Sequence, residues 1–175
     1  FFKDTQSVTV TASDDSYTHD GYTDDKAVKI EYYLHSGDTA LTESDLASAT
    51  FTAYTDKFSI NPDNKYVIYA RLTDFAGNVT YISSDGIVLD ATAPVIKGLE
   101  NGKTYCEAQT VTVTEKYIES VKVNGTEVTL EANNQFTLQA NGEQTIVVTD
   151  KAGNETSVTV TVNNGHTYEW QNENG

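Results

Sequence analysis

Apolar and polar side chains alternate along most of the chain. Residues 7–11 read Ser-Val-Thr-Val-Thr, and residues 157–162 read Ser-Val-Thr-Val-Thr-Val. A period of two residues places one set of side chains on the buried face of a strand and the other set on the solvent face. Threonine, valine and tyrosine, which supply most of these runs, also fit a pleated surface. The pattern predicts an all-β protein.

The alternating runs and the turn residues between them predict the individual strands. One short helix is expected at residues 42–47, where Thr42 and Asp45 resemble a capping box with Asp in place of the usual Glu. Asn124 and Gly125 both accept positive φ, so they predict a two-residue type I′ hairpin turn. The predicted strands are residues 6–13, 27–35, 50–54, 57–60, 65–73 and 79–89, followed by 94–98, 109–115, 118–124, 127–130, 135–139, 144–149 and 155–163.

One turn sequence occurs twice. Residues 73–80 read Thr-Asp-Phe-Ala-Gly-Asn-Val-Thr, and residues 149–156 read Thr-Asp-Lys-Ala-Gly-Asn-Glu-Thr. Each copy lies between two alternating runs, which indicates a hairpin connection near the end of a domain. An aspartate can accept hydrogen bonds from the N–H groups of its own loop, and a glycine can adopt a left-handed conformation. We therefore interpret the repeat as a structural turn and not as a metal-binding loop.

The small residues and proline of the segment 89–95 predict a boundary between two domains. The first domain is expected over residues 1–92 and a smaller one over 93–163, with 164–175 as a tail or the start of a further module. Both lengths suit immunoglobulin-type sandwiches, so the predicted fold is two tandem immunoglobulin-like β-sandwich domains. Alternation assigns one core to Val8, Val10, Ile30, Tyr32, Ile68, Ala70 and Leu72, and the other to Val111, Val113, Val121, Val123, Ile146, Val148, Val158 and Val160.

Several of these strings resemble bacterial immunoglobulin-like repeats of large surface and carbohydrate-active proteins of Gram-positive bacteria. The likeness lies in the strand sequences at 30–33 and 65–71, the two Asp-x-Ala-Gly-Asn turns and the Asp-Ala-Thr-Ala-Pro junction at 90–94. The resemblance implies an extracellular protein, secreted or attached to the cell wall, whose partners are other domains of the same polypeptide. It implies no activity. The first domain departs from the pattern because no clear opening strand precedes Gln6, and Cys106 stands where an aromatic or polar residue is usual.

The composition argues against several classes of function. The formal net charge is −15, with 26 acidic and 11 basic residues, so binding to nucleic acid phosphates is not expected. No apolar run is long enough to span a bilayer, and we expect no membrane insertion. The single cysteine, Cys106, cannot form an internal disulfide, so the cores must hold the fold. We expect a monomer.

The chain carries no recognisable catalytic motif. His19, His35 and His166 are far apart, and no histidine or basic residue adjoins Cys106 to activate its thiol. We therefore predict no enzyme activity and no cofactor. Residues 12–25 contain five aspartates, which suits calcium chemically, but their spacing matches no known calcium loop. We predict that the segment is a solvated loop without a metal ion, with a calcium-stabilised first domain as the alternative.

Strand parity predicts one candidate ligand surface in the first domain. With Ile30, Tyr32 and Leu34 pointing inward, Glu31 and Tyr33 are expected to face solvent. With Ile68, Ala70 and Leu72 inward, Tyr69 and Arg71 do the same, and an inward Ile82 exposes Tyr81. Three aromatic rings beside an acid and a guanidinium can stack on sugars or anchor a protein. The alternative is that the tyrosines stabilise the sheet or are covered by the helical connection. The candidate binding residues are Tyr33, Tyr69, Tyr81 and Arg71, with Glu31 beside them.

These patterns favour a non-catalytic structural spacer or adhesion module of a secreted or cell-surface multidomain protein. The alternative is a carbohydrate-binding accessory module of a glycan-degrading enzyme. Any ligand would then be a glycan or a host or cell-surface protein. Fold alone does not decide between these functions, because unrelated activities occur on the same sandwich.

Overall fold

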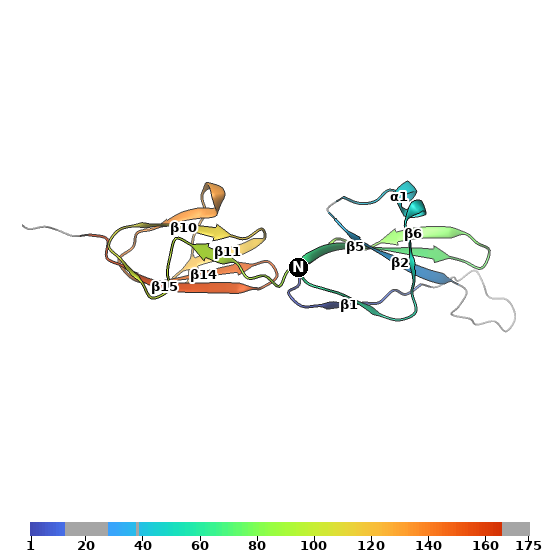
Figure 1. Cartoon of the computed structure of the whole chain (residues 1–175), viewed down its shortest axis with the longest axis horizontal. Coiled ribbons are helices and arrows are strands. Elements are labelled where there is room, and N and C mark those ends of the chain that lie inside the picture. The colour runs from blue at the N-terminus through green and yellow to red at the C-terminus, as the bar shows by residue number, and fades with distance from the viewer. Residues whose placement is uncertain (13–27, 38, 166–175) are drawn as a thin grey trace, which may run out of the picture. The chain divides into compact units, whose positions relative to one another are not determined.

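The computed structural model describes residues 1–12, 28–37 and 39–165, in which strands are by far the main regular structure (Figure 1). The fold is an all-β sandwich, as the alternation predicted. The chain forms two compact units, Phe1–Ala91 and Thr92–Gly175. Each unit is described separately below.

The first unit contains one four-stranded sheet with an added strand, and one two-stranded sheet. In the larger sheet the strand order is β3-β2-β5-β6, and β7 pairs with the start of β5; β1 and β4 form the smaller sheet. Helix α1 lies on one side of the β2–β5–β6 sheet and β1 on the other (Figure 1). The bounds are β1 Gln6–Val8, β2 Lys29–Ser36, α1 Glu43–Ser48, β3 Thr52–Ala53, β4 Phe58–Ile60, β5 Asn64–Thr73, β6 Val79–Ser83 and β7 Ile87–Leu89.

The core of the first unit is small. Its buried cluster consists of Ile60, Ile68 and Leu89, against which Leu34 and Phe58 pack. Burial of Ile68 and Ala70 confirms two predicted core positions. The other predicted members, Val8, Val10, Ile30, Tyr32 and Leu72, are half-buried. Ile60 and Leu89 lie in the predicted strands 57–60 and 79–89 but were not among the predicted core residues; in the structure each belongs to a strand of three residues. Ile82 was predicted to point inward, yet it is 47% exposed.

The expected strand 79–89 is interrupted at Ser84. The N–H of Ser84 donates to the Ile68 oxygen at 2.8 Å, and the Ile68 N–H donates to the Ser84 hydroxyl at 3.0 Å. The side chain thus takes the place of a main-chain partner, and the chain leaves the ladder before re-pairing as β7. The predicted strand 6–13 is also shorter than expected, since among its described residues, 6–12, only 6–8 pair with another strand.

The second unit has a three-stranded sheet, β13-β10-β8, facing a five-stranded sheet, β12-β11-β14-β15-β9 (Figure 1). Strand β9 was not predicted, because two residues that pair in parallel with the end of β15 carry no period of their own. Of the expected strand 127–130 only Glu127 belongs to a strand, the two-residue β12, which begins one residue earlier at Thr126. The bounds are β8 Val95–Lys97, β9 Thr104–Tyr105, β10 Gln109–Thr114, β11 Ile118–Val123, β12 Thr126–Glu127, η1 Ala132–Asn134, β13 Gln135–Leu138, β14 Gly142–Asp150 and β15 Glu155–Val162.

The core of the second unit matches the alternation closely. Six of the eight predicted residues are buried, and the other two, Val123 and Val158, pack partly buried against them. Phe136, Leu138 and Val162 complete the core and were not predicted. The buried residues are Val111, Val113, Val121, Phe136, Leu138, Ile146, Val148, Val160 and Val162.

Both copies of the repeated turn are closed by their own aspartate. The Asp74 carboxylate accepts the N–H and the side-chain amide of Asn78 at 2.8 and 2.7 Å. Asp150 accepts the same two groups of Asn154 at 2.9 and 2.8 Å. The glycines have φ values of +88° at Gly77 and +87° at Gly153. The structural interpretation of the repeat is confirmed.

Candidate functional site

Cross-strand pairing places the four candidate ligand residues on one face of the first unit. Tyr33 of β2 pairs with Tyr69 of β5, and Arg71 of β5 pairs with Tyr81 of β6. Directly opposed residues project from the same face of a sheet, and so do residues two apart on one strand. The four side chains therefore share the face that also carries helix α1, opposite the face toward β1.

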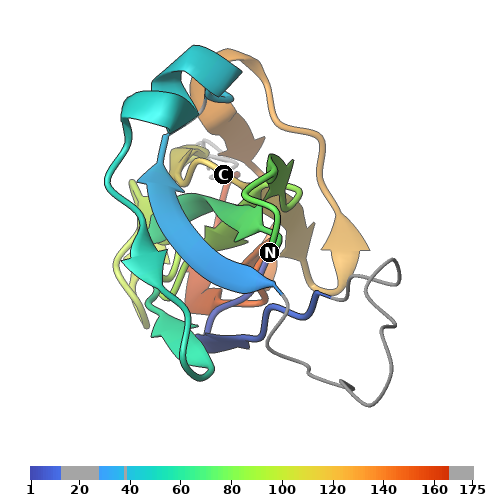
Figure 2. The same ribbon diagram turned by 90° about the vertical axis from the view of Figure 1, so that its right-hand side faces the viewer.

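The connection between β2 and β3 crosses this face. Its helix begins at a capping box, in which the Thr42 N–H donates to the Asp45 carboxylate at 2.8 Å and the Asp45 N–H donates to the Thr42 hydroxyl at 3.3 Å. The buried side chain of Leu46 anchors the helix. Figure 2 shows α1 beside the end of β2 and the chain returning from it to β3. The predicted helix and its cap are confirmed.

Tyr69 is covered by this connection. Its side chain is 4% exposed, and its hydroxyl accepts the N–H of Leu41 at 2.8 Å. The prediction that Tyr69 faces solvent is therefore wrong. The alternation along β5 assigned Tyr69 to the correct face of the sheet. The helical connection covers that face at Tyr69, as the alternative interpretation of the sequence expected.

Phe51 occupies the centre of the candidate surface. Its ring centroid lies 5.9 Å from that of Tyr33 and 5.8 Å from that of Tyr81. The Arg71 guanidinium carbon lies 4.5 Å from the Phe51 centroid, in a cation–π contact. We call Tyr33, Phe51, Arg71 and Tyr81 the aromatic face. Phe51 was missed although it lies in the predicted strand 50–54, because it precedes the two residues that pair as β3, and so short a strand does not mark its direction.

Arg71 forms an ion pair with the buried carboxylate of Glu31. Glu31 is 7% exposed, and Arg71 Nε and a terminal guanidinium nitrogen each lie 2.8 Å from its Oε2. Lys29 Nζ lies 3.0 Å from its Oε1. Burial by itself would raise the pKa of Glu31, but the hydrogen bonds and charges of Lys29 and Arg71 hold that pKa below its usual value. The guanidinium is thus used in packing and in an ion pair.

A hollow of about 360 Å³ opens beside the aromatic face, between α1 and β6. Leu41 and Leu46 line it on the helix side, with the carboxylate-bearing Glu43. Tyr69 and Tyr81 line it on the sheet side. The exposed lining of the hollow is mostly polar, and the half-buried rings of Tyr33 and Phe51 lie beside it. Aromatic surface next to polar groups suits stacking contacts with a sugar or a protein side chain.

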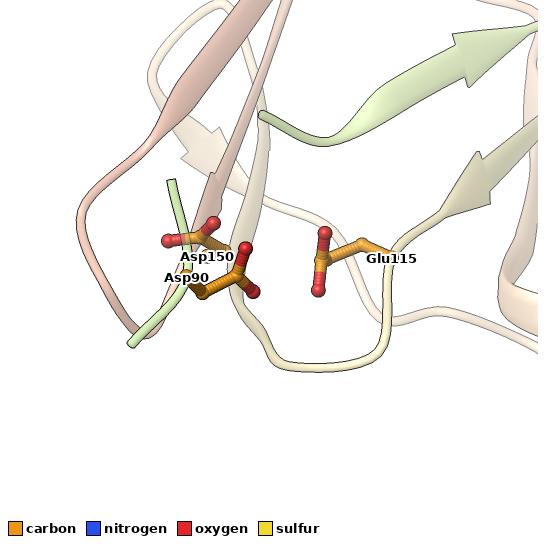
Figure 3. A group of neighbouring side chains, drawn as sticks. All are labelled: Asp90, Glu115 and Asp150. Carbon is orange, nitrogen blue, oxygen red and sulfur yellow. The ribbon is translucent and has the colours of Figure 1, made fainter. Parts of the chain in front are cut away.

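Two carboxylates of the second unit approach each other. Glu115 follows β10, Asp150 ends β14, and their oxygens lie within 4.8 Å (Figure 3). Each already accepts main-chain hydrogen bonds, Glu115 from Lys116 and Tyr117 and Asp150 from Ala152 and Asn154. Two carboxylates supply fewer than the six to eight oxygens that calcium takes.

The groups considered for catalysis do not assemble in the described part of the chain. Of the three histidines, only His35 lies within it, and a ring nitrogen of His35 is 3.0 Å from the Thr39 oxygen. Cys106 is exposed. Most of the aspartate-rich segment 12–25, including His19, lies outside the described residues, as does His166. The described residues include no helix long and apolar enough to cross a membrane.

Among the solved structures that resemble this chain, two are distant neighbours from bacterial proteins. No protein-family model and no curated protein matches the chain. A Bacteroides ovatus surface protein, SGBP-B of a mixed-linkage glucan utilization locus in complex with a mixed-linkage heptasaccharide, is 14% identical with a TM-score of 0.31, over 90% of this chain and 40% of that one. The fibronectin(III)-like modules of Clostridium thermocellum CbhA are 20% identical with a TM-score of 0.31, over 82% and 83% of the two chains.

Proposed function

We propose that this chain is a non-catalytic structural spacer, or adhesion module, of a secreted or cell-surface multidomain bacterial protein. The proposal rests on one observation: the candidate ligand residues already make contacts within the domain. Tyr69 is buried under the connection, and Arg71 lies between Glu31 and Phe51. Side chains committed to packing hold a domain together and leave little to recognise a ligand.

The two-unit architecture supports the same role. Each unit has its own buried cluster, and the segment between β7 and β8 is only a few residues long. A β-sandwich resists extension because many main-chain hydrogen bonds must break together. A short connection also restricts the freedom of one unit relative to the next. These are the properties required to hold other domains of the same polypeptide at a distance from the cell wall.

The alternative is a carbohydrate-binding accessory module. It is favoured by the half-exposed rings of Tyr33, Phe51 and Tyr81 and by the hollow beside them. Aromatic surface of this kind can stack on sugar rings. A spacer requires no such binding, so direct measurement separates the two functions.

Affinity electrophoresis through soluble polysaccharides, together with a glycan array, tests the proposal. As a spacer, the full chain migrates at the same rate in gels with and without polysaccharide, and the array is silent. The matched variant Tyr33→Ser/Tyr81→Ser then behaves like the parent. Retardation of the parent that this double variant loses, while its melting temperature is kept, would replace the spacer by the carbohydrate-binding module.

A further inference from the structure

The chain enters and leaves the second unit along two strands that run side by side in the same direction. Strand β9 pairs in parallel with the end of β15, with Thr104 opposite Thr161 and Tyr105 opposite Val162. The entering chain reaches β9 through β8, and β15 is the last strand of the described chain. The entry and the end of β15 lie at opposite ends of this unit (Figure 1). Pulling the two ends apart therefore draws β9 backward and β15 forward along a common axis.

The pairing continues beyond the two residues of β9. Further main-chain hydrogen bonds join the two segments: the Gly102 N–H donates to the Thr159 oxygen at 2.7 Å, the Thr161 N–H to the Lys103 oxygen at 2.9 Å and the Asn163 N–H to the Tyr105 oxygen at 2.8 Å. We call residues 101–105 together with residues 159–163 the parallel pairing. Its hydrogen bonds lie across the direction of the pull.

The side chain of Asn101 adds a hydrogen bond at the start of the parallel pairing. In a regular parallel ladder the Thr159 N–H would bond to the main-chain oxygen of Asn101, two residues before Lys103. Here Asn101 Oδ1 accepts that N–H at 2.8 Å, next to Gly102 with its φ of +78°. A side-chain oxygen thus takes the place of a main-chain oxygen, and both main-chain groups of Thr159 are bonded to the entering chain.

The segment that leads into β9 is bonded to β9 itself. The Glu100 N–H donates to the Tyr105 hydroxyl at 2.8 Å, and Lys103 Nζ lies 2.7 Å from Glu100 Oε1. The Lys103 N–H also donates to the Glu100 oxygen at 3.1 Å. These contacts close the turn at residues 100–103, so a pull on the entering chain reaches the parallel pairing without first straightening a loose loop.

We propose that the parallel pairing is the force-bearing element of the second unit and sets the rate at which this unit unfolds when its chain is pulled from both ends. Hydrogen bonds between strands pulled past each other must break together, whereas strands pulled apart at one end lose them one at a time. The inference rests on the proposed function, because a spacer between other domains of a polypeptide transmits tension along its chain.

Constant-force spectroscopy of the full chain in two pulling geometries tests the proposal. The shear geometry places the handles at Ala93→Cys and Asn164→Cys in a Cys106→Ser background. The peeling geometry uses the native, exposed Cys106 and Asn164→Cys, which lie at the same end of the two paired segments. Both geometries leave the first unit outside the stretched segment. At equal force the unit unfolds at least about tenfold more slowly in shear, because several hydrogen bonds must break together.

The contribution of Asn101 is tested by three variants in the same two geometries. Asn101→Ala removes one hydrogen bond and raises the unfolding rate in shear about two- to tenfold. It leaves the peeling rate unchanged, because peeling begins at the opposite end of the parallel pairing. Asn101→Asp keeps an oxygen acceptor and restores the parent rate. Asn163→Ala is the matched control, since the bond of Asn163 is made by its main chain.

Equal unfolding rates in the two geometries would overturn the proposal, and so would an effect of Asn101→Ala that is the same in both. The comparison of geometries leaves residues 101–105 and 159–163 unchanged, so it is decisive even where Asn101→Ala does not fold. The proposed function fails by a different result. Retardation in polysaccharide gels would remove the spacer role and leave the ratio of the two unfolding rates as it is.

Discussion

Replacing Ile146 by alanine is expected to lower the free energy of unfolding of the second unit by about 2–5 kcal/mol and to leave the first unit unchanged. Ile146 is 0% exposed and lies in β14, the central strand of its sheet. Truncation removes buried apolar surface and leaves a cavity that a close-packed core fills only in part. The first unit is unaffected because its buried cluster shares no residue with this core.

Urea unfolding followed by hydrogen exchange resolved to each unit measures this effect. Val147→Ala is the matched control, since Val147 is the neighbour of Ile146 on the opposite face of the same strand and is only half-buried. The control should cost less than about 1 kcal/mol. An equal loss of stability in the two units after Ile146→Ala would show that their cores are energetically coupled.

Arg71→Met is expected to destabilise the first unit by about 2–4 kcal/mol. The variant keeps most of the side-chain volume but leaves the buried Glu31 carboxylate with Lys29 as its remaining ion-pair partner. Removing one member of a buried ion pair is costly because the other charge remains desolvated. The cation–π contact with Phe51 is lost as well. Chemical denaturation of the full chain, followed through the transition of the first unit, gives the size of the effect.

The pH dependence of stability tests whether Glu31 causes the destabilisation in Arg71→Met. The pKa of Glu31 is lowered in the folded state from an ordinary value of about 4.3, so its contribution is present above that pH and is lost as pH falls through the folded value. In Arg71→Met the folded-state pKa of Glu31 lies closer to its unfolded value, so the loss of stability on acidification is smaller than in the parent. Glu31→Gln lacks this dependence. An Arg71→Met profile parallel to that of the parent would contradict the explanation.

The repeated turns and the long strands could be predicted because their causes are local. An alternating run such as residues 144–148 contains its own buried face, and Asp150 and Gly153 close their turn within a few residues of sequence. The core of the second unit could therefore be predicted from the alternating runs alone. The short strand β9 escaped prediction because two residues have no period, and its pairing is decided by a distant partner.

The candidate site was predictable only in part, for the same physical reason. Parity placed Tyr33, Arg71 and Tyr81 on one face, since that depends only on position along a strand. The burial of Tyr69 and the position of Phe51 depend on how the connection folds back across the sheet. That path is set by tertiary contacts of Leu41, Leu46 and Phe51, which no local pattern encodes.

The central claim is that the chain consists of independent β-sandwich modules, and the isolated second unit tests it most directly. Residues 92–165 expressed alone should unfold in one cooperative transition, with the same urea midpoint as the second unit in the full chain and with slow amide exchange at Val111, Ile146 and Val160. A fragment that lacks protected amides, or whose midpoint falls well below that in the full chain, would contradict the claim.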